Sequence, residues 1–166
     1  MKKPLILISS FCLLLLNGCS SDEPSQEEIN ETAQEFLEAH NKYRTEVGID
    51  GLVWSDELAT SAAEWAEELE SNCTFQHSDG NYGENLWKGT SNAFSITDVV
   101  DSWGGEKQHY NYESNSCVDG EVCGHYTQIV WSATTEVGCG TATCDGYDIW
   151  VCQYSSQGNI VGQKPY

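Results

Sequence analysis

The stretch Gly124-His-Tyr-Thr-Gln-Ile-Val-Trp131 marks a change in the character of the sequence. Its last residues are mostly β-branched or aromatic, as is typical of strands, so we expect a strand over 127–131. Two further strands are expected at 136–143 and 148–154, on either side of the turn signal Asp145-Gly146. The second half of the chain is therefore expected to be rich in strands.

The part of the chain before this stretch has helical periodicity instead. Apolar side chains recur at steps of three and four residues over 31–47 and again over 58–69. The second of these segments follows Ser55, a residue type that caps helix N-termini. A third, shorter helix is expected to begin near Ser95 or Thr97. Because helices precede strands and do not alternate with them, the sequence predicts an α+β domain.

The composition limits the class of protein. The 166-residue chain carries 26 acidic against 7 basic residues, a formal net charge of −19. Such a chain repels phosphate backbones, which excludes nucleic-acid binding. Six Trp, eight Tyr and four Phe are too many for a disordered acidic segment, so we expect a buried core. The length indicates a single domain, and we expect a monomer.

The N-terminal residues have the pattern of an export signal. Two lysines precede an apolar run over 5–16, which is shorter than the about 20 residues that span a bilayer. Leu16-Asn17-Gly18-Cys19 resembles the lipobox of bacterial lipoproteins, in which the cysteine becomes the acylated N-terminus. We therefore predict a lipoprotein signal peptide over 1–18 and lipidation of Cys19. The alternative is an ordinary signal peptide that ends near a cysteine.

An acidic, polar segment follows this cysteine. Residues 19–30 include Pro24 and are interpreted as a flexible tether, which leaves a domain over 31–166. The membrane is the predicted partner through the lipid anchor, because each buried CH2 group contributes about 0.8 kcal/mol. Ser20-Ser21-Asp22-Glu23 also resembles an acidic export signal of surface lipoproteins, the alternative being a solvated linker. The predicted location is a bacterial cell envelope, with the domain surface-exposed or extracellular.

Eight cysteines in a chain of this length indicate an oxidising compartment. Cys12 leaves with the signal peptide and Cys19 is assigned to lipidation. The six that remain suggest three disulfides, in several pairings that the sequence alone leaves open. A zinc ribbon is not indicated, because these six contain no C-x2-C pair.

Four titratable residues have a context that points to a site: His77, Glu84, Glu106 and His125. Each of them lies beside a glycine or a turn signal. Neither composition nor spacing shows that they meet in space, since no two of them share a metal-binding motif such as H-E-x-x-H.

Four motifs, in order along the chain, resemble those of the CAP superfamily. This superfamily groups cysteine-rich secretory proteins, antigen 5 and pathogenesis-related proteins of the first class. The matching segments are 124–131, Ile149-Trp-Val-Cys-Gln-Tyr154, His40-Asn-Lys-Tyr-Arg44 and Gly83-Glu-Asn-Leu86. The ending 158–166 is very like the close of plant members, so the resemblance covers about 31–166.

The resemblance implies the fold and the disulfides. It implies a three-layer α-β-α sandwich within the α+β class. The cysteine pairs that it implies are Cys73–Cys144, Cys117–Cys123 and Cys139–Cys152.

The same resemblance implies a central cleft in which the two histidines and two glutamates meet. His77 and His125 are then the candidate metal ligands, because neutral imidazoles bind Zn²⁺ or another divalent cation while carboxylates orient them. Some members are proposed proteases with a serine beside this cleft; Ser78 matches it and, with Glu84 and Glu106, is a candidate catalytic residue. The chain has no G-x-S-x-G motif, which argues against an ordinary serine hydrolase. A purely structural polar network is the remaining interpretation.

Three functions therefore stay open. The first is a lipid-anchored, non-enzymatic binding module whose cleft holds a divalent cation and a small ligand, such as a sterol, another lipid or a peptide. The second is a metal- or serine-assisted hydrolase that acts on peptides or cell-wall material. The third is a structural or host-interaction role at the cell surface.

Other polar residues in the motifs are given structural roles. His40 is expected to be a satisfied core histidine, because it lies on the apolar stripe of the first helix. Asn41 and Arg44 are expected to tie this helix to a loop, and Asn85 to bond to backbone. His109 is expected to be an exposed polar residue.

Overall fold

The computed structural model describes residues 26–166. The expected signal peptide, Cys19 and the first part of the expected tether lie outside the described residues. Helix α1 (Gln26–Val47) begins before Glu31, so residues 26–30 are helical and the predicted tether was too long at this end. No helix within 26–166 is long and apolar enough to cross a membrane.

A four-stranded sheet lies at the centre of the structure, with the strand order β1-β5-β6-β2. β1 (Val53–Trp54) pairs in parallel with β5 (Glu136–Cys144). β6 (Tyr147–Ser155) pairs antiparallel with both β5 and β2 (Gly83–Thr90). The two strands expected around Asp145-Gly146 are confirmed as β5 and β6, whereas β2 and β1 were not predicted.

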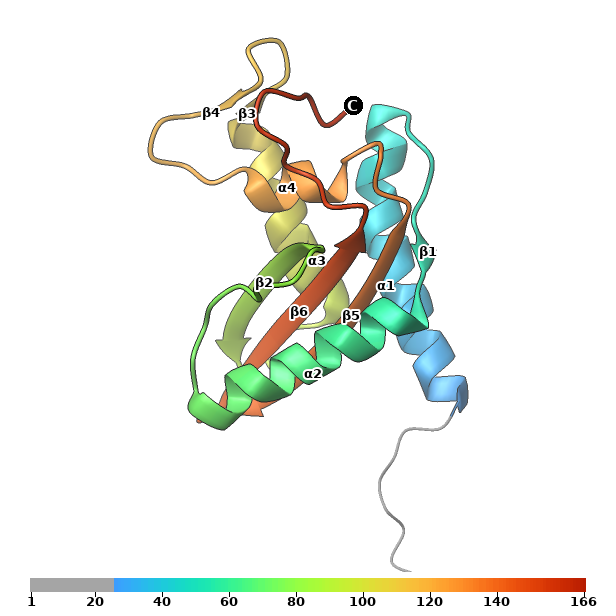
Figure 1. The fold of residues 1–166 in the computed structure, drawn as a ribbon, viewed down its shortest axis with the longest axis vertical. Helices are drawn as coiled ribbons and strands as arrows, with labels where there is room; N and C mark the ends of the chain where they lie inside the picture. The colour runs from blue at the N-terminus through green and yellow to red at the C-terminus, as the bar shows by residue number, and fades with distance from the viewer. Residues whose placement is uncertain (1–25) are drawn as a thin grey trace, which may run out of the picture.

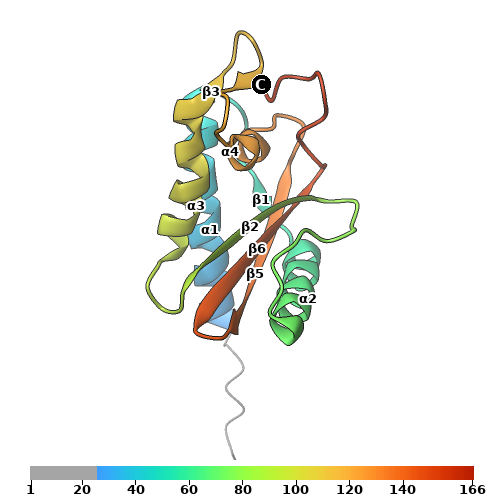
Figure 2. The same cartoon turned by 90° about the vertical axis from the view of Figure 1, so that its left-hand side faces the viewer.

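Helices cover both faces of this sheet (Figure 1). α2 (Asp56–Asn72) lies on one face, and α1, α3 (Ile96–Gly104) and α4 (Gly124–Ile129) lie on the other, as Figure 2 shows from the side. The turn of 3₁₀ helix Gly105–His109 continues α3 and leads to the short hairpin of β3 (Tyr110–Asn111) and β4 (Ser116–Cys117). The expected three-layer α-β-α sandwich is confirmed.

The central strand β6 is buried on both faces. Ile149 and Val151 pack in the cluster under α2, whereas Cys152 and Tyr154 pack in the cluster with α1 and α3. All four side chains are fully buried. Successive side chains of a strand point to opposite faces, so one strand supplies both cores.

The N-terminal caps of α2 and α3 are residues that the sequence indicated. Ser55 caps α2 by accepting a hydrogen bond from the Leu58 amide. Ser95 caps α3 in a capping box, in which its hydroxyl and the Asp98 carboxylate each bond the other's backbone amide.

The strand predicted over 127–131 is wrong, because Gly124–Ile129 forms helix α4. The Glu106 carboxylate accepts hydrogen bonds from the first amides of this helix, those of His125 and Tyr126. Ile129 and Tyr126 are buried in the core between α4 and the sheet. Packing and this distant carboxylate therefore override the local preference for a strand.

The three disulfides have the pairing that the resemblance implied. Cys73–Cys144 joins the residue after α2 to the end of β5, across 71 positions of the sequence. Cys139–Cys152 links β5 to β6, and Cys117–Cys123 closes the loop before α4. Each such bridge typically stabilises a domain by about 2–4 kcal/mol, mainly by restricting the unfolded chain.

Helix α2 approaches β5 so closely that the strand needs glycine. A Cβ atom at Gly138 would lie 2.1 Å from the Ala59 backbone nitrogen, and one at Gly140 would lie 2.4 Å from Ala63 Cα. These contacts are with backbone, which cannot move aside as a flexible side chain can. The two glycines therefore set the spacing between the sheet and its α2 layer.

We predict that Gly138→Ala lowers the free energy of unfolding by about 1–3 kcal/mol, because the helix must move away from the sheet. Urea denaturation followed by circular dichroism measures this loss. Gly105→Ala is the control, since a Cβ at Gly105 meets nothing within 4 Å. Equal stability of the two variants would contradict the close-approach argument.

Candidate functional site

The first imidazole–carboxylate pair lies where the segment after α2 meets the start of β2. His77 Nδ1 lies 2.8 Å from Glu84 Oε1. The same carboxylate accepts hydrogen bonds from the backbone amide and hydroxyl of Ser78 and from Gln153 Nε2. The Glu84 side chain is 5% exposed and that of His77 is 61% exposed. The buried carboxylate thus anchors an imidazole that faces solvent.

The second pair lies at the N-terminus of α4. His125 Nδ1 lies 2.6 Å from Glu106 Oε1, and the His125 ring stacks on Trp103 with ring centroids 6.2 Å apart. Glu106 also caps α4, as described above. The His125 side chain is 28% exposed, so this imidazole is more enclosed than His77.

Asn85 connects the two pairs. It follows Glu84 in β2, and its Nδ2 donates to the His125 backbone carbonyl over 3.1 Å and to the Tyr154 hydroxyl over 3.1 Å. The first pair is therefore tied through one residue of β2 to the helix that carries the second. This agrees with the expectation that Asn85 bonds to backbone.

Both imidazoles present the same edge to their surroundings. A carboxylate accepts hydrogen bonds, so in each neutral ring Nδ1 carries the proton and Nε2 keeps its lone pair. Within residues 26–166, neither Nε2 atom has a hydrogen-bond partner. Histidines that bind metals are typically held in this way, with Nδ1–H on a carboxylate and Nε2 toward the metal.

The four residues do not form a compact set of ligands for one ion. Within the described part of the chain, the one group of three His, Cys, Asp or Glu ligand atoms within 4.8 Å of one another is Cys73, Cys144 and Asp145. Those two sulfur atoms form a disulfide and are not available to a metal. The Nε2 atoms of His77 and His125 remain the candidate ligand atoms for a metal, with the glutamates orienting the rings.

The candidate serine has a different partner from that of a hydrolytic nucleophile. The Ser78 hydroxyl donates to Glu84 Oε2 over 2.7 Å, and the His77 Nδ1 atom is bonded to the same carboxylate. A serine nucleophile is usually activated by a hydrogen bond to an imidazole. Ser78 instead helps to hold the Glu84 carboxylate in place through its amide and its hydroxyl.

The cavities near the site differ in what lines them. His77, Ser78 and Glu84 border a cavity of about 210 Å³, together with Tyr82. Glu106 borders another cavity, of about 440 Å³. Glu84 and Glu106 therefore border different cavities, and His125 lines neither of them.

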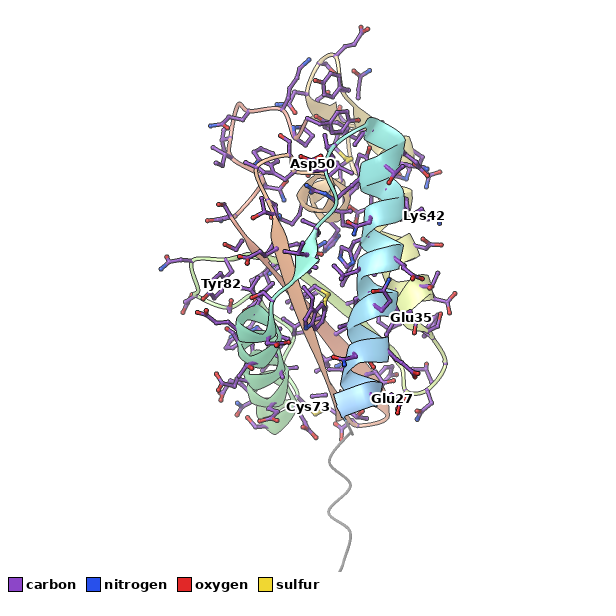
Figure 3. All side chains as sticks on the ribbon, turned by 90° about the vertical axis from the view of Figure 1, so that its right-hand side faces the viewer. Glu27, Glu35, Lys42, Asp50, Cys73 and Tyr82 are labelled. Carbon is purple, nitrogen blue, oxygen red and sulfur yellow. A yellow bond between two sulfur atoms is a disulfide. The ribbon has the colours of Figure 1, made fainter. Side chains whose placement is uncertain are left out.

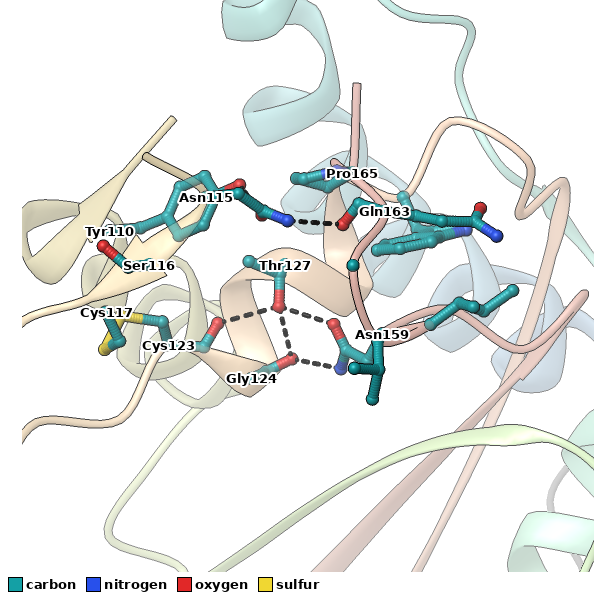
Figure 4. A pocket seen from close by; sticks show the side chains of 14 residues that line it. Tyr110, Asn115, Ser116, Cys117, Cys123, Gly124, Thr127, Asn159, Gln163 and Pro165 are labelled. Atoms are coloured by element: carbon teal, nitrogen blue, oxygen red, sulfur yellow. Dashed lines mark hydrogen bonds between the residues drawn. A yellow bond between two sulfur atoms is a disulfide. The ribbon is translucent and has the colours of Figure 1, made fainter. Parts of the chain in front are cut away.

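A further cavity of about 270 Å³ lies between the β3–β4 hairpin, α4 and the C-terminal segment (Figure 4). Asn115 Nδ2 donates to the Gln163 carbonyl over 2.8 Å and ties the hairpin to this segment. Asn159 Nδ2 donates to the Gly124 carbonyl over 2.8 Å on the other side. The apolar part of its lining includes Trp131 and Ile160.

The expected core histidine is confirmed. His40 is fully buried; its Nδ1 lies 2.8 Å from the Phe36 carbonyl and its Nε2 2.8 Å from the Tyr154 hydroxyl. Burial lowers the pKa of His40 to about 4, although the bond to Phe36 acts in the opposite direction. The ring is therefore neutral at pH 7, donates from Nδ1 and accepts the Tyr154 proton at Nε2.

The other polar residues of the first motif hold loops in place, as expected. The buried Arg44 guanidinium donates to the carbonyls of Asp50, Ile129, Trp131 and Thr134. Asn41 bonds both the amide and the carbonyl of Leu52. His109 is partly exposed and lies 3.5 Å from Glu121.

Two buried glutamines were missed by sequence reasoning. Gln153 bonds Glu84, and Gln128 Oε1 accepts from the Gly158 amide. Each is 2% exposed. The sequence feature that could have indicated a buried glutamine is a polar residue within an otherwise apolar or aromatic run. For Gln153 this run is Ile149-Trp-Val-Cys-Gln-Tyr154.

Residues 37–154 match the sequence profile of CAP, the cysteine-rich secretory protein family. The chain belongs to the CAP family. Pathogenesis-related protein 1B of Nicotiana tabacum is 38% identical over 162 residues, which cover 96% of this CAP protein and 92% of the relative.

Solved structures share the fold of this CAP protein. The Schistosoma mansoni venom allergen-like protein 4 has a TM-score of 0.67 at 27% identity, covering 82% of this chain and 94% of its own. NaASP2, solved with Zn²⁺, has a TM-score of 0.66 at 24% identity and 90% coverage of both chains. At that identity the second likeness concerns the fold alone.

We predict that His40 makes this CAP protein less stable in acid. The unfolded chain takes up a proton near pH 6.5 and the folded one near pH 4, so stability falls as the pH drops through this window. Between pH 7 and pH 5 the loss from His40 is about 2 kcal/mol.

Urea denaturation at both pH values tests this. The matched variant His40→Gln is expected to be less stable at pH 7, because it disrupts the bonds to Phe36 and Tyr154, but to lose less on acidification. An equal loss in the wild-type protein and the variant would contradict the assignment to His40.

Proposed function

We propose that this CAP protein is a secreted, lipid-anchored binding module whose two imidazoles hold a divalent cation such as Zn²⁺. The observation that carries the proposal is the matched state of His77 and His125. In both, a carboxylate holds Nδ1, and Nε2 has no hydrogen-bond partner among the residues that the structure describes. Neutral imidazole Nε2 is a preferred ligand atom for zinc. NaASP2, which shares this fold, was solved with Zn²⁺.

A small ligand is the second part of the proposal. The cavity of about 270 Å³ is near the lower end of the range for ligand sites. Ile160, Val161 and Pro165 from the C-terminal segment supply apolar lining there. This cavity suits a small apolar molecule or one end of a lipid. The cavity of about 210 Å³ bordered by His77, here called the histidine-lined cavity, has polar residues around it and suits a peptide.

We expect zinc binding to depend on both histidines. Titration calorimetry on the purified protein should give a weaker zinc affinity for His77→Ala and for His125→Ala. The expected loss is about 10-fold or more, as is typical when a zinc site is perturbed. His109→Ala is the control, because it removes a partly exposed imidazole outside the two pairs. Equal zinc affinity of the wild-type protein and the double variant His77→Ala with His125→Ala would refute the cation part of the proposal.

A hydrolase is the alternative that the same residues permit. Ser78 lies beside the Glu84 carboxylate, but both contacts described for its amide and hydroxyl support Glu84. Turnover of a peptide library that is lost in Ser78→Ala, with unchanged stability, would favour this alternative. A purely structural role predicts instead that substitutions at the two pairs change only the melting temperature.

The proposed anchor is tested by removing its attachment point. We predict that Cys19→Ala moves the mature protein from the detergent phase to the aqueous phase in detergent phase partitioning, because it can no longer be acylated. Cys12→Ala is the control, since it leaves the lipobox intact. Recovery of the wild-type protein in the aqueous phase would instead indicate an ordinary signal peptide.

A further inference from the structure

A cavity of about 340 Å³ lies beside the histidine-lined one, between α2 and the segment that follows it. That segment turns back alongside α2 (Figure 1), and Tyr82 near its end lies beside the helix (Figure 3). Glu64, Trp65 and Glu68 line the cavity from α2, with Tyr82 and Gln153 from other segments. None of these side chains belongs to the two imidazole–carboxylate pairs.

Two unneutralised carboxylates lie on the helical wall. Glu64 and Glu68 are one helical turn apart, where like charges repel each other. Within the described residues neither is in an ion pair, and Glu68 accepts one side-chain hydrogen bond, from Asn72. α2 contains six acidic residues and no basic one, so the chain supplies no cation along this helix.

Two aromatic rings form further parts of the wall. Trp65 and Tyr82 are both half-buried. Trp65 Nε1 donates to the Gln76 carbonyl over 3.2 Å, which holds the indole against the returning segment. Aromatic faces attract cations, so rings beside carboxylates are a typical environment for a positively charged group.

The remaining wall has an unfilled hydrogen-bond acceptor. Gln153 is 2% exposed, and its Nε2 donates to Glu84 Oε2 over 3.1 Å. Its Oε1 has no hydrogen-bond partner among residues 26–166. Buried amide oxygens are nearly always paired, so a ligand that carries N–H donors would supply what this acceptor lacks.

We infer that this cavity binds a basic side chain of a peptide ligand, arginine in preference to lysine. A guanidinium stacks on aromatic rings and presents several N–H donors in one plane, which suits two carboxylates and an amide oxygen. The inference rests on the proposed function as a binding module, because Ser78 and Tyr82 border both this cavity and the histidine-lined one. A peptide along the two cavities would place its arginine beside α2.

The test compares two blocked pentapeptides, one with a central arginine among alanines and one with citrulline in its place. Citrulline keeps the shape but carries no charge. Titration calorimetry on the full-length protein should show at least tenfold weaker binding of the citrulline peptide. Glu64→Gln with Glu68→Gln should weaken arginine-peptide binding at least tenfold, while Glu67→Gln with Glu70→Gln, which changes the charge of α2 equally outside the cavity, should leave it unchanged.

Several outcomes would overturn the inference. These are the absence of arginine-peptide binding, equal binding of the two peptides, and an equal loss in both double variants, which would indicate general attraction to an acidic helix. Binding of a neutral oligosaccharide with no binding of the arginine peptide would assign the cavity to sugars and also overturn it. Circular dichroism checks that the variants are folded.

The zinc experiment and the peptide experiment test separate claims, so either claim can fail without the other. The peptide titration is done without metal and repeated with the double variant His77→Ala with His125→Ala. Arginine-selective binding that persists there supports this inference even if zinc does not bind. Zinc binding without arginine selectivity supports the proposed cation site and overturns the inference.

Discussion

A buried chain of hydrogen bonds through Tyr154 holds the layers in register. Its hydroxyl donates to His40 on α1 and accepts from Asn85 on β2, and Asn85 in turn donates to the backbone carbonyl of His125. The links are 2.8 to 3.1 Å long, and the groups at the centre of the chain of bonds are buried. Because an unpaired polar group in this interior would be costly, the chain of bonds fixes one arrangement of α1, the sheet and α4.

The glutamates of the candidate site stabilise the fold as well as orienting the histidines. Glu84 accepts four hydrogen bonds from two segments of the chain, and Glu106 caps α4 while holding His125. Removing either carboxylate would disturb local structure and imidazole position together. The histidines, which are more exposed, are the residues whose substitution separates ligand binding from folding.

Charge is distributed unevenly between the two helical layers. On the α1–α3 side, Lys42 pairs with Asp101 and Lys107 pairs with Glu46, and the buried Arg44 binds carbonyl oxygens. On the α2 side the described acidic residues have no such partner. Among the described residues, no Lys or Arg side chain therefore offsets the acidic charge of α2.

The sequence by itself determined the family, through its four ordered motifs, and the long helices, because amphipathic periodicity and caps such as Ser55 and Ser95 are local properties. The family in turn supplied the cysteine pairs. The prediction from local preference was wrong at α4. Its β-branched residues favour a strand, but the Glu106 carboxylate, distant in sequence, caps this segment as a helix. Only the tertiary structure decided that His77 and His125 belong to two linked pairs and that Gln153 lines the same cavity as Glu64 and Glu68. These residues come from segments that are far apart in the sequence, and no local pattern shows that they meet.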